Sequence, residues 1–131
     1  MTELEKTEKI TINLGFVDLG QIDLLVQEGF YTNRTDFVRT AIRNQLATHS
    51  DVVKHVVARK TLVLGMEHYT SYDLEAVRTA GQKLQISVLG LLSIAEDVSP
   101  ELAQATIDSI QVLGAFHAST AVKAVLAERI R

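Results

Sequence analysis

One alternating segment followed by two helical segments, all within residues 9–46, constrains the fold more than any other feature of the chain. Segment 9–14 has the period of a half-buried strand, with apolar and polar residues alternating: Ile10, Ile12 and Leu14 against Lys9, Thr11 and Asn13. An isolated strand leaves its backbone groups unpaired along both edges, which is a liability that proteins avoid. The segment therefore predicts pairing with the same strand of a second copy of the chain.

Capping residues mark the two helices that follow. Asp18 with Gln21 resembles a capping box that opens the first helix, and Gly29 suits the position just after its C-terminus. Asn33 is a good N-cap for the second helix, with Asp36 at the third helical position. The residues at helical spacing in the second helix are Phe37, Val38, Ala41, Ile42, Gln45 and Leu46.

One strand and two capped helices at this spacing resemble the ribbon-helix-helix family of DNA-binding dimers, of the CopG, Arc and MetJ type. The resemblance covers residues 9–47, and the loop after Gly29 is especially similar to the ParD-like antitoxin branch. It implies that two strands pair antiparallel and that their outward side chains enter the major groove of DNA. By position, the base-reading residues would be Lys9, Thr11 and Asn13. The DNA phosphate-binding residues, at the start of the second helix, would be Asn33, Arg34 and Thr35.

The segment departs from the family pattern in two ways. Gly15 and Phe16 stand where the family often has a proline, and Lys9 is the one cation in the base-reading set. Asn13 can still hydrogen-bond adenine in bidentate fashion, and Thr11 can contact a thymine methyl group. The ribbon would therefore read bases more by shape and hydrogen bonding than by charge.

Charge over the whole chain does not favour nucleic acid. There are 13 Lys and Arg residues against 16 Asp and Glu residues, a formal net charge of −3. Because neutralised phosphates supply most non-specific affinity, any DNA contact requires a locally positive surface. Arg39 and Arg43, four residues apart, are more typical of solvated charges than of phosphate ligands. Arg34 has the better claim to an anion, because a cation at a helix start is otherwise unfavourable.

A repeat begins after residue 60. The segments TLVLG, ISVLG and IQVLG end at Gly65, Gly90 and Gly114, at nearly equal spacing, which is typical of stacked repeats. Chance similarity of three such strands is the alternative. Each unit is predicted as a strand, a turn at the glycine, a second short extended piece and a helix. The predicted helix starts are Thr70 with Asp73, Ser99 with Pro100, and Ser119.

The predicted fold class is α+β. An N-terminal arm (residues 1–8) precedes a ribbon-helix-helix dimerisation module (9–48) and a helical connector (49–60), and a small C-terminal α/β repeat domain of three strand-helix units, solenoid-like, completes the chain (61–131). The connector holds no proline or glycine, so it either continues the second helix or forms a new one. Because the repeat has no strongly polar cap, we expect it to associate with another copy.

The residue types in the chain give no support for a catalytic site or a metal site. The chain has no cysteine and no catalytic motif. The histidines form no close pair on one helix face; a site between His68 and His117, each three residues after a repeat glycine, is a minor alternative. We expect no cofactor and no metal. With no secretion signal and no apolar run long enough to span a membrane, we expect a cytoplasmic protein.

These observations predict a sequence-specific DNA-binding transcriptional regulator, not an enzyme. It would act as a repressor that binds double-stranded DNA as a homodimer and forms a higher oligomer through residues 61–131. Two alternatives remain open. The ParD-like loop suggests the antitoxin of a toxin-antitoxin pair, although antitoxins usually cover the toxin with a flexible tail. The negative charge suggests a non-DNA assembly protein.

Overall fold

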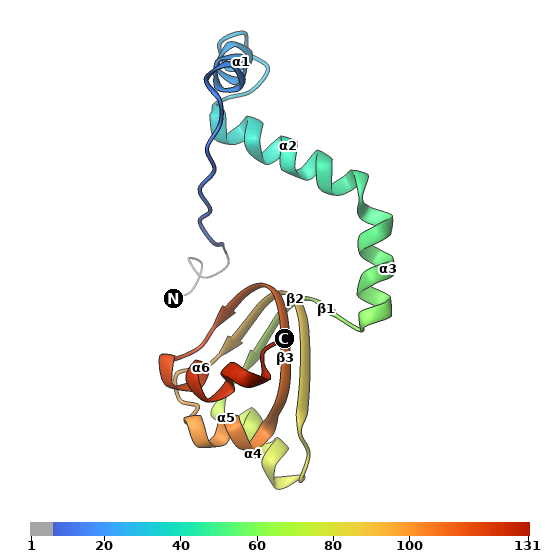
Figure 1. Ribbon diagram of the computed structural model, residues 1–131, viewed down its shortest axis with the longest axis vertical. Helices are drawn as coiled ribbons and strands as arrows, with labels where there is room; N and C mark the ends of the chain where they lie inside the picture. Colours follow the sequence, from blue (N-terminus) through green and yellow to red (C-terminus); the bar gives the residue numbers. More distant parts are fainter. Residues whose placement is uncertain (1–6) are drawn as a thin grey trace. The chain divides into compact units, whose positions relative to one another are not determined.

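The computed structural model describes residues 7–131, which form two compact units, Thr7–His55 and Val56–Arg131 (Figure 1). Residues 1–6, most of the predicted arm, lie outside the described residues. Residues 7–15 precede the first helix without forming a ladder within the chain. The helices that follow are α1 (Phe16–Gln27), α2 (Arg34–Thr48) and α3 (Ser50–Lys60). Because α2 ends before α3 begins, the connector is a new helix and not a continuation of α2.

The first helix begins earlier than its sequence predicts. Gly15 is the N-cap of α1 and no side chain caps this end, so the predicted capping box of Asp18 and Gln21 is wrong. The helix runs through Phe16 and Val17, and Asp18 lies inside the first turn, where the helix dipole favours a carboxylate. Carboxylate side chains are favoured both at the N-cap and in the first turn of a helix. Asp18 alone therefore does not distinguish the two positions, which explains the error.

The loop between α1 and α2 follows the predicted signals. Gly29 has φ +91°, and its N–H donates to the carbonyl of Val26 at 3.1 Å. The N–H of the next residue, Phe30, donates to the carbonyl of Leu25 at 3.0 Å, which completes a Schellman motif. The side chain of Asn33 then caps α2, as predicted.

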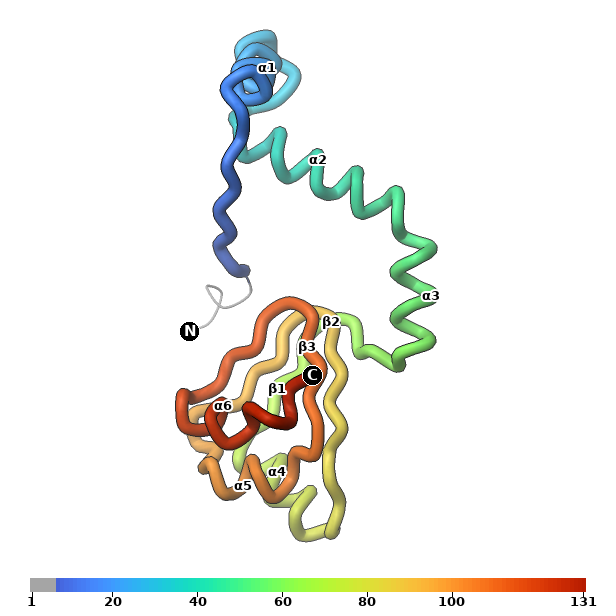
Figure 2. Tube along the Cα trace, in the orientation of Figure 1, coloured from blue at the N-terminus to red at the C-terminus, as the bar shows by residue number. Residues whose placement is uncertain are grey.

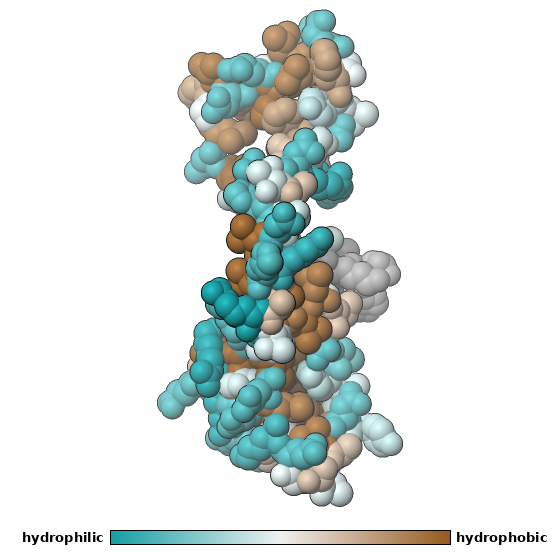
Figure 3. Space-filling view, turned by 90° about the vertical axis from the view of Figure 1, so that its right-hand side faces the viewer, coloured by the Kyte–Doolittle hydropathy of each residue, from teal (hydrophilic) through white to brown (hydrophobic). Residues whose placement is uncertain are grey.

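The N-terminal unit buries very little apolar surface. Ile22 is the only buried residue within residues 7–55, and one edge-to-face contact joins Tyr31 to Phe37, with ring centroids 5.0 Å apart. Many large apolar side chains are exposed, so brown surface is visible around α1 and α2 (Figure 3): Ile10, Ile12, Leu14, Phe16, Val17, Leu24, Phe30, Ile42 and Leu46. Short helices owe their stability to packing of an apolar face. The unit therefore requires further apolar surface to cover it.

A three-stranded parallel sheet forms the centre of the second unit, in the order β1-β2-β3 (Figure 1). Each strand is followed by a helix, and a short 3-10 helix ends the series. This confirms the α+β class; the described residues form a single sheet with helices, and no solenoid. In chain order the elements are β1 (Val63–Tyr69), α4 (Ser71–Thr79), β2 (Leu84–Ile94), α5 (Pro100–Thr106), β3 (Ile107–His117), α6 (Thr120–Leu126) and η2 (Ala127–Arg129).

The repeat glycines lie inside the strands, so the predicted turns are wrong. Gly65, Gly90 and Gly114 are register partners across the sheet, with φ of 126°, 143° and 127°. A Cβ on Gly90 would overlap the carbonyl oxygen of Gly65, and one on Gly114 would overlap that of Gly90. Figure 2 shows β2 and β3 bending about half-way along their length. Only glycine tolerates this backbone and this close approach, so each glycine permits a bend within one continuous strand.

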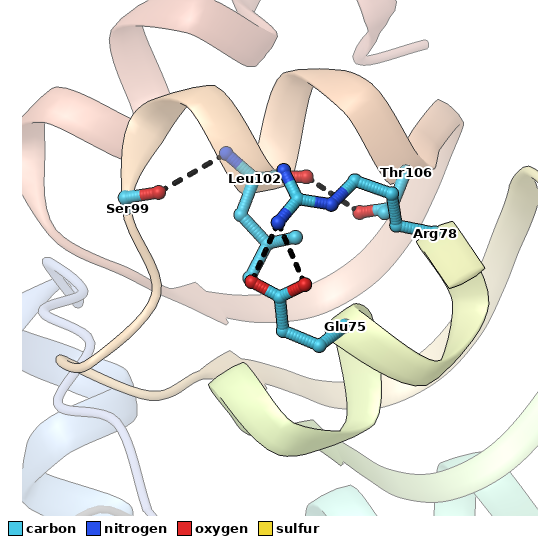
Figure 4. Close-up of polar contacts among 5 residues, drawn as sticks. All are labelled: Glu75, Arg78, Ser99, Leu102 and Thr106. Atoms are coloured by element: carbon cyan, nitrogen blue, oxygen red, sulfur yellow. Dashed lines mark hydrogen bonds and ion pairs between the residues drawn. The ribbon is translucent and has the colours of Figure 1, made fainter.

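The predicted N-caps of the C-terminal helices are confirmed. Thr70 and Asp73 form a reciprocal capping box at α4. The Oγ of Ser99 accepts from the backbone N–H of Leu102 at 3.1 Å at the start of α5 (Figure 4). The Oγ of Ser119 caps α6 in the same way. Each cap satisfies a backbone donor that the first turn leaves without an intrahelical partner.

The helices α4 and α5 contact each other beside the sheet. On α4 a guanidinium nitrogen of Arg78 lies 2.6 Å from Glu75 Oε1, and on α5 the hydroxyl of Thr106 donates to the carbonyl of Leu102 at 2.8 Å (Figure 4). Thr106 is the only buried polar residue among residues 7–131. Its hydroxyl is satisfied within its own helix, so no buried polar side chain of the described residues is left without a partner.

Alternate side chains of the strands divide between two faces. One set packs against α4, α5 and α6 and forms the core together with helix and loop residues: Ile86, Val88, Leu92, Ile94, Ile107 and Ile110 from the strands, with Leu74, Val98, Leu102, Ala103, Val122 and Leu126. The other set points away from the helices and includes two apolar rows across the sheet: Leu64, Leu89 and Leu113, then Met66, Leu91 and Ala115. Parallel sheets are usually covered on both faces, and here one apolar face is open.

No helix within residues 7–131 combines the length and apolar character needed to cross a lipid bilayer.

Candidate nucleic-acid interface

The predicted base-reading residues lie on the segment before α1. Lys9, Thr11 and Asn13 are all exposed, and so are the apolar residues between them, with Ile10 74% and Ile12 58% exposed. Alternate residues of an extended chain point to opposite sides. Pairing with a second strand would place the apolar set against the helices and the polar set outward. The alternation of the segment thus keeps a set of polar side chains apart from a set of apolar side chains.

The start of α2 carries the predicted phosphate-binding residues. The side-chain oxygen of Asn33 accepts from the N–H of Asp36 at 2.7 Å, and the Asp36 carboxylate in turn accepts from the N–H of Thr32 at 3.0 Å. These two bonds fix the entry into the helix. The Asn33 side chain is therefore used as a cap. An anion at this end would meet the remaining free backbone amides of the first turn and the positive end of the helix dipole.

A shallow hollow of about 260 Å³ lies beside this helix start. Asn33 and Thr35 both line it, whereas Arg34 does not. Its remaining lining includes Arg39 and Arg43, two cations on the same face of α2, and one carboxylate, that of Asp36. Because two positive charges face one negative charge, the hollow is a locally positive surface on a chain of negative net charge.

Arg34 points instead toward α1. Its Nε lies 2.8 Å from Oδ1 of Asp23, and its second guanidinium nitrogen lies 2.8 Å from Oδ2. This hydrogen-bonded pair holds the pKa of the Asp23 carboxyl below its usual range and raises the pKa of the Arg34 guanidinium. The bidentate geometry fits guanidinium and carboxylate well. Arg34 is thus already paired in the single chain, and a phosphate would have to compete with Asp23.

Residues of two kinds at this site were not predicted from the sequence. Asp23 gave no signal, because a contact between separate helices cannot be predicted from spacing within one of them. Arg39 and Arg43 did give a signal, their four-residue spacing, but were read as solvated charges. Thr35, Arg39 and Arg43 are spaced four residues apart, which could have linked both arginines to the helix start, since residues four apart share a helix face.

The model of the Ribbon-Helix-Helix transcriptional regulator family matches residues 5–123. The match spans the segment before α1, all three helices of the N-terminal half and the sheet of the second unit as far as α6. Comparison with curated proteins and with solved structures gave no match.

Proposed function

The chain belongs to the ribbon-helix-helix family of transcriptional regulators, and from this premise we propose that it is a sequence-specific repressor whose two-stranded ribbon reads the major groove. The family comprises DNA-binding regulators and not enzymes, and its members typically bind DNA as dimers. The main support for a ribbon that reads bases is segment 9–14, where polar and apolar residues alternate and all are exposed. Working on DNA, the protein would be cytoplasmic.

Two copies of segment 9–14 would form the ribbon. Antiparallel pairing satisfies their backbone groups and brings the apolar residues of both chains over the helices. The burial of Ile22 alone within residues 7–55 supports this, since the second chain would supply the apolar surface that the unit lacks. Lys9, Thr11 and Asn13 would then face the base edges. A good bidentate contact from Asn13 to adenine is worth about 1 to 3 kcal/mol of discrimination.

The start of α2 would hold the ribbon in register by binding a DNA phosphate. Contacts to phosphate position a protein on the duplex and carry no sequence information of their own. The free amides of the first turn, with Asn33 and Thr35 at their sides, would contact the phosphate, and Arg39 and Arg43 would add charge. Arg34 would contribute by exchanging Asp23 for the phosphate. Occupying an operator in this way would exclude polymerase.

Selection of bound sites from random DNA, at a stated salt concentration, tests the proposal directly. The parent should enrich one short motif. Asn13→Ala should relax the base preference at one position of each half-site, whereas Arg39→Ala should weaken binding to every sequence alike. The control is Asn44→Ala, on α2 outside the hollow, which should bind like the parent. If Asn13→Ala enriched the same motif with the same preference, the assignment of the ribbon would be wrong.

We also propose that residues 61–131 form a repeat domain that joins dimers into a higher oligomer, with residues 9–48 as the DNA-binding module and 49–60 as the connector. The open apolar face of the sheet supports this proposal. Leu64 and Leu113 are 69% and 49% exposed, and no charged residue stands in the two apolar rows. Packing of two such faces buries apolar surface without opposing like charges.

Light scattering at micromolar concentration tests this assembly. Leu64→Lys with Leu113→Lys should reduce the parent oligomer to dimers. Tyr72→Lys, at a large side chain on α4 that is 84% exposed, is the control and should leave the oligomer intact. A parent protein that stayed a strict dimer would overturn the proposal. The folded second unit, in place of a flexible tail, does not favour the antitoxin alternative.

A further inference from the structure

A second hollow, of about 570 Å³, lies at the carboxyl ends of the three strands. His68, Ser93 and His117 line it, one from each strand, and they are register partners across the sheet. Each stands three residues after its repeat glycine. Because the glycines are register partners, the same position of every repeat unit comes to one end of the sheet. At that position the outward side chains change from apolar to polar.

Lys123 adds a positive charge to this hollow from α6. Its ammonium nitrogen lies 5.5 Å from the centroid of the Phe116 ring, a cation-π arrangement that holds the flexible side chain over the end of β3. Glu96 lines the hollow from the loop after β2, and the remaining wall is apolar: Ile94, Ala95 and Ala118. One lysine, one serine, two histidines and one carboxylate thus border a single space.

We propose that this hollow binds a small organic oxyanion, with a phosphate or carboxylate group held by Lys123 and the polar row. The hydroxyl of Ser93 and the imidazole of His68 can donate hydrogen bonds to oxyanion oxygens, and a charge-assisted bond from the ammonium is stronger than either. Glu96 would accept from a hydroxyl or amine of the same ligand. The volume falls within the range of pockets that hold small molecules. No group of three metal-ligating side chains comes together within residues 7–131.

The position within the sheet supports a binding role. In open parallel sheets, ligands bind outside the carboxyl ends of the strands, most often where the strand order reverses; the hollow lies at this end of the sheet, although the order β1-β2-β3 has no reversal. Here the loops after the strands lead into the three helix starts, while the core is built from the opposite set of strand residues. The polar row therefore contributes nothing to the core. The hollow would serve as an effector site. A ligand could occupy it in the absence of DNA, so the proposal can be tested separately from DNA binding.

The test is titration of the full-length protein by isothermal calorimetry, without DNA, at constant ionic strength in a chloride buffer. Inorganic phosphate and citrate are the two probes, and a preference for one identifies phosphate or carboxylate as the group recognised. The parent should show one saturable site per chain for the preferred probe. Lys123→Met, which keeps a side chain over Phe116, should weaken that site about tenfold, the loss of one charge-assisted bond.

Lys83→Met is the matched control, because it removes the same charge from the loop before β2, outside the hollow. It should leave the affinity unchanged. Ser93→Ala is the second variant and should also weaken binding while leaving the core residues untouched. Phosphate bound at the start of α2 would respond to Arg39→Ala and not to Lys123→Met. If neither probe bound saturably, or if the Lys123 and Lys83 variants behaved alike, the proposed site would be excluded.

Discussion

Arg34 and Asp23 form a bidentate ion pair that ties the start of α2 to α1. Both side chains are about half exposed, at 58% and 49%, so the pair adds little to stability. If Arg34 binds a DNA phosphate as proposed, the pair should have a larger effect on DNA binding, because Asp23 already neutralises the Arg34 charge. On this proposal Asp23 would compete with DNA for the same guanidinium.

Removal of Asp23 should therefore strengthen DNA binding. Asp23→Asn frees Arg34 and removes a negative charge near the phosphate, so we expect higher affinity for every sequence and a salt slope steeper by about one unit. Arg34→Ala should have the opposite effect on both quantities. Fluorescence anisotropy at several KCl concentrations measures them. Asp51→Asn, which removes the same charge from α3, is the control; equal effects of both Asp variants would show that the ion pair itself is unimportant.

The capping box of α4 should make the second unit sensitive to acid. A backbone hydrogen bond from Thr70, aided by its hydroxyl, lowers the pKa of Asp73. A lowered pKa stabilises the folded state at every pH above the ordinary carboxyl pKa, and this stabilisation disappears as the pH falls through the lowered value. Urea unfolding between pH 7 and pH 3 should show the parent more stable than Asp73→Asn at neutral pH, with the difference shrinking toward pH 3. A difference between the two proteins that stayed constant from pH 7 to pH 3 would contradict this prediction.

The three repeat glycines should differ in their tolerance of alanine. Gly65 and Gly90 have similar backbone conformations, with φ of 126° and 143°, but only at Gly90 does a Cβ meet the carbonyl of a neighbouring strand. Gly65→Ala should cost about 1 to 3 kcal/mol of backbone strain. Gly90→Ala adds a steric overlap and should cost more, or prevent folding of the sheet. Chemical denaturation, followed by circular dichroism, gives the order; equal costs would mean that the backbone conformation alone requires glycine.

Local signals in the sequence predicted much of this fold. The N-caps Asn33, Ser99 and Ser119 act within three residues of themselves, so their effect can be read from a short stretch of chain. The same holds for Gly29, whose positive φ ends α1. The repeat of VLG segments predicted equivalent strands, and their glycines are register partners. Pairing at equal register follows because every unit repeats the same order of strand and helix.

The remaining features depend on contacts between distant parts of the chain. The sequence marks Gly90 as a residue that permits unusual backbone, but a turn and a bend within a strand both use that freedom. Only the neighbouring strand, which brings Gly65 against it, decides between them. The pairing of Arg34 with Asp23 likewise requires the packing of α1 on α2. For the base-reading residues the missing information is a second chain, so their roles stay predictions.

The stability of the N-terminal unit should depend on protein concentration. Ile12 is exposed in the single chain and belongs to the apolar set of segment 9–14, so its burial requires the partner strand. Because a dimer is stabilised by mass action, the thermal midpoint of this unit should rise with concentration in the parent. Ile12→Lys should abolish that dependence and DNA binding together, since a charge would face the apolar side of the ribbon. Thr11→Lys places the same charge on the opposite side and should preserve the concentration dependence of the thermal midpoint. Circular dichroism melting over a hundredfold range of concentration, about micromolar to 100 μM, makes the comparison, and an unchanged concentration dependence in Ile12→Lys would rule out the ribbon as the dimer contact.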